Sequence, residues 1–453
     1  MSPIFNSCTA ANADEPTERR RDNNVKIGIR ARLRETICLM PGNSHNPLGL
    51  YISIPFCRSK CTYCNFASGV YPASEHKRYV DRLIEDLASA ADWAVRMGVE
   101  LPRTVDTVYL GGGTPSLLAP ELLEKLFNAL RTQFDLEPEA EITVECAPGQ
   151  IADETLGAFQ VVGVNRVSMG VQSFIDREAQ VSGRLHSRAV VEQDLRRLRL
   201  AGIANLNVDL IAGLAGQTMA SWEESLAALV DSEVPHASVY MLEVDEDSRL
   251  GREMLSGGAR YYAGLVPTDD AIAQMYTRAL ESLGQARLEQ YEISNFSRPG
   301  FTSRHNLRYW ERRPYLGLGL DASSMMREAD SGYVLRSTTT SDLGEFLTGQ
   351  KPVETAWLSP ARQFEEAWFL GLRLNRGVDV AALEQEFGPE PVARAISVVA
   401  ALEEDGLVES DGESVRLTAR GRMLSNDVFQ AFLGLDAGEP EPKCPESEAL
   451  ITK

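Results

Sequence analysis

Three cysteines stand close together in the first part of the chain. Cys57, Cys61 and Cys64 follow the spacing Cys-x3-Cys-x2-Cys. Three thiolates on one short loop can bind three irons of a [4Fe–4S] cluster and leave the fourth iron open to a small ligand. The alternative is a structural zinc site, which takes four protein ligands, commonly as two separated pairs. The sequence has no second pair nearby, so the spacing favours the cluster.

A glycine run and a glutamate each follow a short apolar run. Gly111, Gly112 and Gly113 lack side chains, so their backbone can approach a ligand closely, although a tight exit from a strand would also need them. Glu145 can accept hydrogen bonds from ligand hydroxyl groups, but a buried carboxylate with a protein partner fits the pattern equally well. Cys146 directly follows Glu145, so its side chain should point to the opposite face of the strand, into the core.

These residues belong to a pattern of alternating strands and helices. The expected strands are 49–55, 105–110, 141–146, 164–169, 205–211 and 237–242. The expected helices are 75–98, 120–133, 153–162, 187–201, 217–230 and 268–287. Such alternation predicts parallel strands joined by right-handed crossovers.

Two folds satisfy this alternation, a partial (β/α)6 barrel and an open doubly wound sheet. In either fold, ligands bind at the carboxyl ends of the strands. The cysteines, the glycine run and Glu145 all fall at such ends. The sequence therefore predicts an α/β core over residues 49–300, with its functional site at one edge of the sheet.

The segment 361–433 has a different pattern. Two expected helices, 361–373 and 392–404, precede two short apolar runs that are separated by Asp411-Gly412, a strong hairpin signal. We interpret this segment as a small winged-helix-like α+β module. It has 7 basic residues against 13 acidic ones, so it is a poor binder of a phosphate backbone and is expected to cover or dock instead.

The remaining segments are polar or irregular. Residues 1–48 form a leader and residues 434–453 form a tail rich in Pro and Glu, and both are expected to be disordered. Met40 lies shortly before the first expected strand and is an alternative start to Met1. Residues 301–360 are expected to connect the core to the C-terminal module.

The composition limits the classes of function. A net charge of −20 over 453 residues opposes binding to nucleic acid and to anionic membranes. No apolar run reaches the about 18–20 residues that cross a bilayer, so a transmembrane protein is not expected. Residues 1–48 lack the apolar region of a secretory signal, so the expected location is the cytoplasm.

Longer motifs give the chain a resemblance to a known family. They are Tyr51 to Cys57, Tyr109 to Pro115, Gly163 to Phe174, Asn207 to Leu214 and His305 to Trp310. Together with the cysteine spacing, they resemble the radical S-adenosylmethionine superfamily. Within it, the chain is similar to the anaerobic coproporphyrinogen III oxidase-like family, most closely to its heme chaperone HemW group. The resemblance covers roughly residues 49–433, and the combination of motifs is highly specific.

The resemblance implies roles for particular residues. Cys57, Cys61 and Cys64 would hold the [4Fe–4S] cluster, and S-adenosylmethionine would bind its open iron. In the family, reductive cleavage of this ligand gives methionine and a 5′-deoxyadenosyl radical. The residues expected to line the S-adenosylmethionine site are Tyr51, Tyr63, Gly112, Gly113, Thr114, Glu145, Gln172, Arg184 and Asp209.

Two positions bear on the choice of function. The dehydrogenase of the family carries a fourth cysteine two positions after the third, where this chain has Phe66, as in the chaperone group. In that group the run from His305 to Trp310 is associated with heme, and imidazole is a common axial ligand of heme iron. On local sequence alone, a core histidine beside packed aromatic residues is an equally good interpretation. His305 is the candidate heme ligand.

The resemblance thus favours a heme chaperone, which carries heme as cargo and delivers it to an acceptor protein. The implied partners are heme, the acceptor and an electron donor, and a homodimer is a further expectation. Oxygen-independent coproporphyrinogen III dehydrogenase is the alternative. A radical enzyme with another substrate is a third hypothesis.

Overall fold

The computed structural model describes residues 46–328, 332–349 and 354–435. Most of the predicted leader over 1–48, with both Met1 and Met40, and nearly all of the predicted tail over 434–453 lie outside the described residues.

The core is one large sheet. Its twelve strands lie in the order β12-β11-β10-β9-β1-β2-β3-β4-β5-β6-β8-β7. The first six strands along the chain are β1 (Leu48–Ile54), β2 (Thr104–Gly112), β3 (Asp135–Cys146), β4 (Arg166–Gln172), β5 (Asn205–Ala212) and β6 (His236–Met241). From β1 to β6, neighbouring strands pair in parallel.

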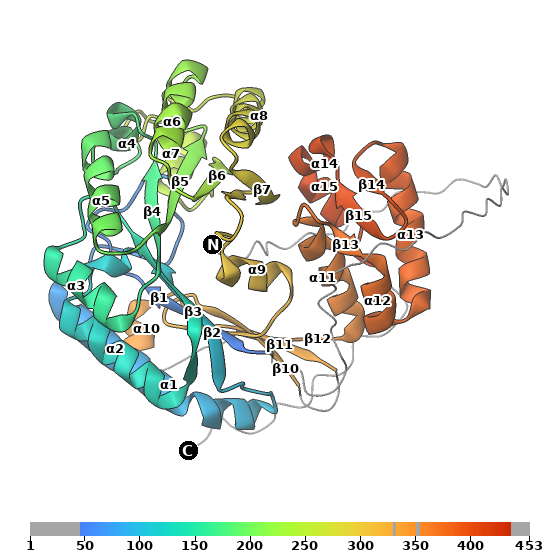
Figure 1. The fold of residues 1–453 in the computed structure, drawn as a ribbon, viewed down its shortest axis with the longest axis horizontal. Helices are drawn as coiled ribbons and strands as arrows, with labels where there is room; N and C mark the ends of the chain where they lie inside the picture. The colour runs from blue at the N-terminus through green and yellow to red at the C-terminus, as the bar shows by residue number, and fades with distance from the viewer. Residues whose placement is uncertain (1–45, 329–331, 350–353, 436–453) are drawn as a thin grey trace. The chain divides into compact units, whose positions relative to one another are not determined.

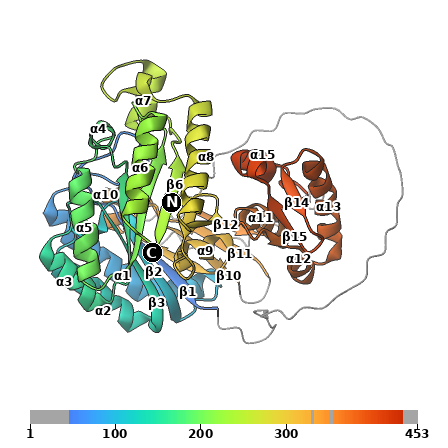
Figure 2. The same ribbon diagram turned by 45° about the horizontal axis from the view of Figure 1, so that its top comes forward.

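The crossovers between these strands contain helices. They are α1 (Ala73–Met97), η1 (Pro115–Leu117), α2 (Pro120–Gln133), α3 (Asp153–Val162), α4 (Asp176–Val181), α5 (Arg188–Leu200) and α6 (Met219–Asp231). After β6 come α7 (Arg249–Ser256), η2 (Ala263–Leu265) and α8 (Asp269–Gln285). Figures 1 and 2 both show α1, α2, α3, α5 and α6 along the outer side of the sheet.

The strand order decides between the two predicted folds. A doubly wound sheet reverses its order at a switch point, so that helices cover both faces. Here β1 to β6 are neighbours in sequence order, and successive right-handed crossovers then place the helices on one face. This is the predicted partial (β/α)6 barrel, and in the described part of the chain the sheet does not close on itself.

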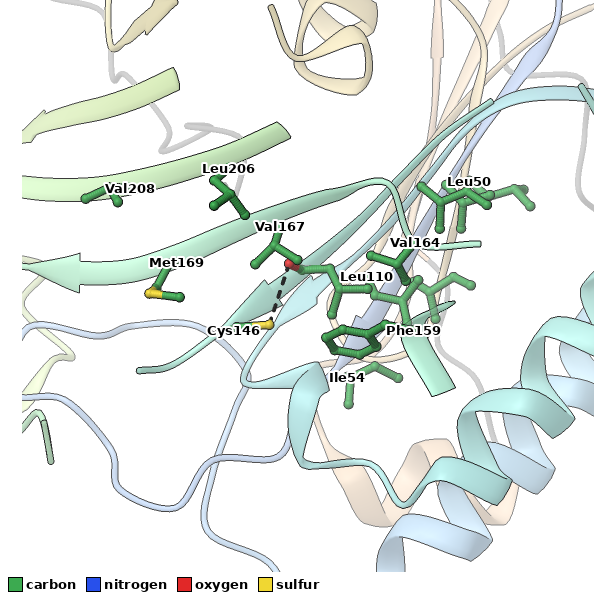
Figure 3. Close-up of a cluster of buried hydrophobic side chains, with 14 of the residues drawn as sticks. Leu50, Ile54, Leu110, Cys146, Phe159, Val164, Val167, Met169, Leu206 and Val208 are labelled. Atoms are coloured by element: carbon green, nitrogen blue, oxygen red, sulfur yellow. Dashed lines mark hydrogen bonds between the residues drawn. The ribbon is translucent and has the colours of Figure 1, made fainter. Parts of the chain in front are cut away.

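The outer face of the sheet is the apolar core. Alternate residues of the strands, such as Val144, Val167 and Val208, are fully buried against the helices. Cys146 belongs to this cluster, as predicted, and its thiol donates to the Val144 carbonyl oxygen, 3.9 Å away (Figure 3). This cysteine is therefore a core residue.

The inner face of the same strands is polar. Parallel strands that are buried on both faces are usually apolar throughout. Here β3 to β6 instead direct polar side chains to the inside of the partial barrel, because side chains alternate along a strand. The inner residues are Glu141, Thr143, Glu145, Arg166, Ser168, Asn207, Asp209, His236 and Ser238. A polar interior is suited to holding a polar ligand.

The segment predicted to connect core and module extends the same sheet. Its elements are α9 (Arg304–Trp310), β9 (Tyr315–Leu318), β10 (Ser323–Arg327), β11 (Val334–Thr338), α10 (Leu343–Thr348) and β12 (Glu354–Leu358). β9 pairs in parallel with β1, and β10 to β12 continue antiparallel. At the other edge lie β8 (Asn295–Ser297) and β7 (Glu289–Glu292). The predicted domain boundaries stay predictions. The large sheet contains strands from both sides of the predicted boundary at residue 300.

The C-terminal part has its own small core and sheet. Its elements are α11 (Pro360–Leu372), β13 (Val378–Asp379), α12 (Val380–Phe387), α13 (Pro389–Glu404), β14 (Val408–Ser410), β15 (Ser414–Leu417), α14 (Ala419–Met423) and α15 (Ser425–Gln430). β14 and β15 form the predicted hairpin, whose turn is held by Asp411 Oδ1 accepting from the N–H of Ser414, 2.8 Å away. Gly412 has a φ of 86°, which glycine adopts without strain. The winged-helix-like architecture is as predicted.

Candidate functional site

The three-cysteine loop follows β1 and is fixed by backbone hydrogen bonds. The N–H of Cys57 donates to the Gly69 carbonyl, and the N–H of Gly69 donates to the Pro55 carbonyl, both at 2.8 Å. The N–H of Thr62 donates to the carbonyl of Ser182, 3.0 Å away, in the loop after α4. Cys61 is buried, whereas Cys57 and Cys64 are partly exposed. The loop therefore holds its thiols at a defined place at the carboxyl end of β1.

Each of the three sulfurs has a polar neighbour. The Thr114 hydroxyl donates to Cys57 Sγ at 3.9 Å, and the Ser68 hydroxyl lies 3.9 Å from Cys64 Sγ. Arg184 Nη1 donates to Cys61 Sγ at 3.5 Å. Donors around sulfur and a nearby cation stabilise thiolates and are the usual surroundings of thiolate-bound metal centres.

The arrangement of the thiols separates the two predicted kinds of metal site. In the described part of the chain, no three His, Cys, Asp or Glu side chains gather around a point for a single metal ion. A structural zinc needs its ligands at one point, whereas a cubane cluster takes each thiolate on a different iron. Burial raises the pKa of the Cys57 thiol, and a metal that binds the sulfur as thiolate would offset this cost. The residues present fit a [4Fe–4S] cluster.

The glycine run makes a close backbone contact with the cysteine loop. The N–H of Gly113 donates to the Ile54 carbonyl at 2.9 Å, and a Cβ at Gly113 would lie 2.7 Å from that oxygen. Gly112 has a φ of 94°, and its N–H donates to Glu145 Oε2 at 3.2 Å. At these two positions the glycines serve the close approach of chain segments, which was the alternative to ligand contact. Their predicted contact with S-adenosylmethionine stays a prediction.

Glu145 lies at the end of β3 on the inner face. Its Oε1 accepts from the Tyr109 hydroxyl at 2.8 Å. Burial raises the pKa of Glu145. Burial likewise raises the pKa of Tyr51 and Tyr109, so both phenols stay neutral. The rings of Tyr51 and Tyr109 are stacked with their centroids 6.1 Å apart. Glu145 therefore stands at the edge of an aromatic group and presents a carboxylate to the interior.

The remaining predicted ligand contacts fall on β4, β5 and the loop after α4. Gln172 ends β4 with a φ of 70°, and its buried Oε1 has no hydrogen-bond partner in the part of the chain that the structure describes. Asp209 accepts from Asn207 Nδ2 at 2.7 Å and from the Ser168 hydroxyl at 3.3 Å. Arg184 also donates to the carbonyl of Gly170. The strain and the unpartnered amide oxygen at Gln172 are what a ligand contact would explain.

His305 lies deep inside, near the first turn of α9. Its side chain is 1% exposed, Nδ1 is hydrogen-bonded to the Thr107 hydroxyl and Nε2 to the Tyr309 hydroxyl, both at 2.9 Å. Its ring also stacks on Tyr109, with centroids 5.2 Å apart. This geometry is that of a core histidine, the second of the two interpretations. The role of His305 in heme binding stays a prediction. It requires the hydrogen bond between Nε2 and the Tyr309 hydroxyl to break.

The predicted residues thus form two connected groups. Cys57, Cys61, Cys64, Thr114 and Arg184 come together at the sulfurs. Burial, and then the neighbouring Cys61 thiol, raise the pKa of Tyr63, although Arg184 opposes the shift. In the other group, Glu145 accepts from the Tyr109 hydroxyl and from the N–H of Gly112, and Tyr51 stacks on Tyr109.

Four further residues line the interior but were not predicted as site residues: Tyr109, Arg166, Ser168 and Asn207. The alternation of polar and apolar residues in Asn207-Val208-Asp209-Leu210 could have indicated them.

Comparisons with known proteins place the chain in a family. Residues 51–229 match the family model of the radical SAM superfamily, and residues 358–424 match the model of the HemN C-terminal domain. A solved structure described as coproporphyrinogen III oxidase (HemN) from Escherichia coli has a TM-score of 0.73 at 22% identity. The aligned region covers 85% of this chain and 90% of the chain in that structure. At that identity the likeness supports the fold alone.

Two curated relatives are more similar in sequence. The protein named heme chaperone HemW of Lactococcus lactis is 33% identical, covering 85% of this chain and 97% of its own length. The protein of the same name in Bacillus subtilis is 32% identical, covering 85% and 98%. The chain belongs to the radical SAM superfamily and, within it, to the HemW family. A [4Fe–4S] cluster and S-adenosylmethionine follow from the superfamily. In the described residues, no helix combines the length and apolarity that crossing a membrane requires.

Proposed function

We propose that this chain binds heme and passes it to an acceptor protein, with a cluster on Cys57, Cys61 and Cys64 and S-adenosylmethionine beside it. The relatives that carry the name heme chaperone are about 30% identical over nearly their whole length. One observation carries the choice between chaperone and dehydrogenase. Phe66, 38% exposed, stands where the dehydrogenase pattern has a fourth cysteine.

The residues of the site support this proposal by their chemistry. When bound, a [4Fe–4S] cluster supplies one electron to S-adenosylmethionine, which no side chain can provide. Arg184 would balance the negative charge of the Cys61 thiolate, which its Nη1 already contacts at 3.5 Å. Glu145 would accept from ligand hydroxyls with the oxygen atoms that now accept from Tyr109 and Gly112.

The stacked rings of Tyr51, Tyr109 and His305 support the heme part of the proposal. Tyr51 and Tyr109 stack at 6.1 Å, and Tyr109 and His305 stack at 5.2 Å. A continuous aromatic wall beside an imidazole suits a flat macrocycle. We infer that heme binds on the inner side of the partial barrel. An electron donor, a homodimer and a cytoplasmic location stay predictions.

The test uses the full chain, reconstituted with iron and sulfide without oxygen. Heme binding is followed by the Soret band, and transfer is followed by the spectrum of an added heme-free b-type protein. In a separate assay, coproporphyrinogen III is incubated with S-adenosylmethionine and a reductant, and porphyrin products are separated chromatographically. We expect heme binding and transfer without formation of protoporphyrinogen. Robust protoporphyrinogen formation without heme transfer would establish the dehydrogenase instead.

A further inference from the structure

Arg166, at the start of β4, is a buried cation without a partner among the residues that the structure describes. Its side chain is 1% exposed, and among the described residues its guanidinium forms no hydrogen bond and no ion pair. Arg308 is buried to the same degree but pairs with Asp106 and donates to the Pro47 carbonyl at 2.8 Å. An unpaired buried charge is unfavourable, and it becomes favourable when a ligand of opposite charge binds beside it.

The neighbours of Arg166 in the sheet are unpartnered as well. Arg166 lies in register with Thr143 of β3 on one side and Asn205 of β5 on the other. Residues in register on parallel strands direct their side chains to the same face. Buried Thr143 Oγ1 and Asn205 Oδ1, like Arg166 Nε, have no hydrogen-bond partner among the described residues. Three adjacent positions inside the partial barrel therefore offer unused polar atoms.

The charges around Arg166 leave it available to an anion. Asp209 contributes a nearby negative charge, but its oxygens already accept from Ser168 and Asn207. Burial, and then the charge of Arg166, lower the pKa of His236, so this ring is neutral. Burial, then Arg308, then Arg166 lower the pKa of His305 in the same way. The charge of Arg166 thus affects the part of the interior in which His305 lies.

We propose that Arg166 anchors a carboxylate of the ligand held inside the partial barrel. A guanidinium binds a carboxylate through two parallel N–H donors, and the Thr143 hydroxyl can supply a third donor. This inference rests on the proposed function, under which the carboxylate is a propionate group of heme. A small molecule with a free carboxylate would bind Arg166 by the same chemistry. The experiment distinguishes such a molecule from heme.

The first arm of the experiment measures thermal unfolding of ligand-free protein. Arg166→Met removes an unpaired buried charge and keeps most of the side-chain volume, so Tm should stay the same or rise. Arg308→Met, the matched control, breaks a buried ion pair and should lower Tm. A large fall of Tm for Arg166→Met would mean that Arg166 is held by the protein itself, and would overturn the proposal.

The second arm compares heme with its dimethyl ester, which lacks both propionate charges. Wild type should bind heme at least about tenfold more tightly than the ester, as expected for a charged hydrogen bond. Arg166→Met should bind the two equally, and Arg166→Lys should recover part of the preference. Arg177→Met, which removes an exposed charge, should keep it. Equal binding of heme and ester by wild type would overturn the proposal while leaving the proposed function intact.

The third arm is independent of heme. Sodium acetate is compared with sodium chloride at equal ionic strength, and Tm is measured for wild type and Arg166→Met. If wild type binds no heme, the proposed function fails. An acetate-dependent rise of Tm that disappears in Arg166→Met then still supports the carboxylate site. If wild type binds no heme and acetate does not raise its Tm either, the carboxylate site is overturned as well.

Discussion

Nη1 of Arg184 donates a hydrogen bond to Sγ of Cys61, 3.5 Å away, although 123 residues separate the two in sequence. Arg184 is held in place by its second contact, to the carbonyl of Gly170 at the inner edge of β4. A fixed cation beside one of three sulfurs would offset the negative charge of a metal-bound thiolate there. The contact links the strand that ends in Gln172 to the cysteine loop.

Arg184→Met should leave a cluster in place but make it harder to reduce. Hydrogen bonds and positive charge near cluster sulfurs raise the reduction potential, so their loss should lower it by tens of millivolts. Anaerobic potentiometric titration measures this, and Arg184→Lys should recover part of the shift. A potential identical to that of wild type would show that the contact with Cys61 does not matter to the cluster.

Glu145→Gln should weaken the binding of S-adenosylmethionine by about tenfold or more, because a charge-assisted hydrogen bond is replaced by a neutral one. The fold should be retained, since the amide oxygen can still accept from Tyr109 or Gly112. Equilibrium dialysis of the reconstituted protein measures the affinity. An affinity within twofold of wild type, with intact cluster content, would remove Glu145 from the ligand site.

Glu292 gives a prediction for pH. Burial raises its pKa in the folded state above the ordinary value of 4.5, although Arg373 lies 3.6 Å away and opposes the shift. The folded state therefore binds the proton more tightly, and the free energy of unfolding falls as pH rises through the window above 4.5. Glu292→Gln should flatten this slope in urea titrations of ligand-free protein. An unchanged slope would mean that Glu292 titrates normally.

His305 and Tyr309 should have opposite effects on heme. His305→Ala should abolish the shifted Soret band, since the proposed iron ligand is gone. Tyr309→Phe removes the hydroxyl that occupies Nε2 at 2.9 Å, so heme should bind several-fold more tightly, by the value of about one hydrogen bond. Heme titrations of both variants measure this. Unchanged affinity and spectrum in His305→Ala would leave the core interpretation of His305 as the correct one.

The sequence predicted the six parallel strands because each is an apolar run of ordinary length between helices with a clear period. It missed β9, which joins the sheet beside β1. β9 has only the four residues Tyr315–Leu318, and it pairs with a strand some 260 residues earlier. No local pattern reports such a pairing. β4 also ends at Gln172, beyond the expected 169, because the run to Val171 continues past Gly170.

The site was predictable where chemistry depends on spacing, as for the three cysteines. It was not predictable where a role depends on burial. Arg166 looks like an ordinary charged residue at the start of a strand, and only the register with Thr143 and Asn205 places it inside without a partner. For His305 the opposite holds. Its sequence neighbours suggested a heme ligand, whereas in the structure both ring nitrogens form hydrogen bonds within the protein.

The iron and acid-labile sulfide content of the anaerobically reconstituted chain tests the assignment of Cys57, Cys61 and Cys64 most directly. Wild type should hold about four irons and four sulfides, the composition of one [4Fe–4S] cluster, whose reduced form gives an electron paramagnetic resonance signal that S-adenosylmethionine alters. Cys57→Ala should lose them, whereas Cys146→Ser, at the core cysteine, should keep them. Zinc without sulfide in wild type, or a full cluster in Cys57→Ala, would contradict this assignment.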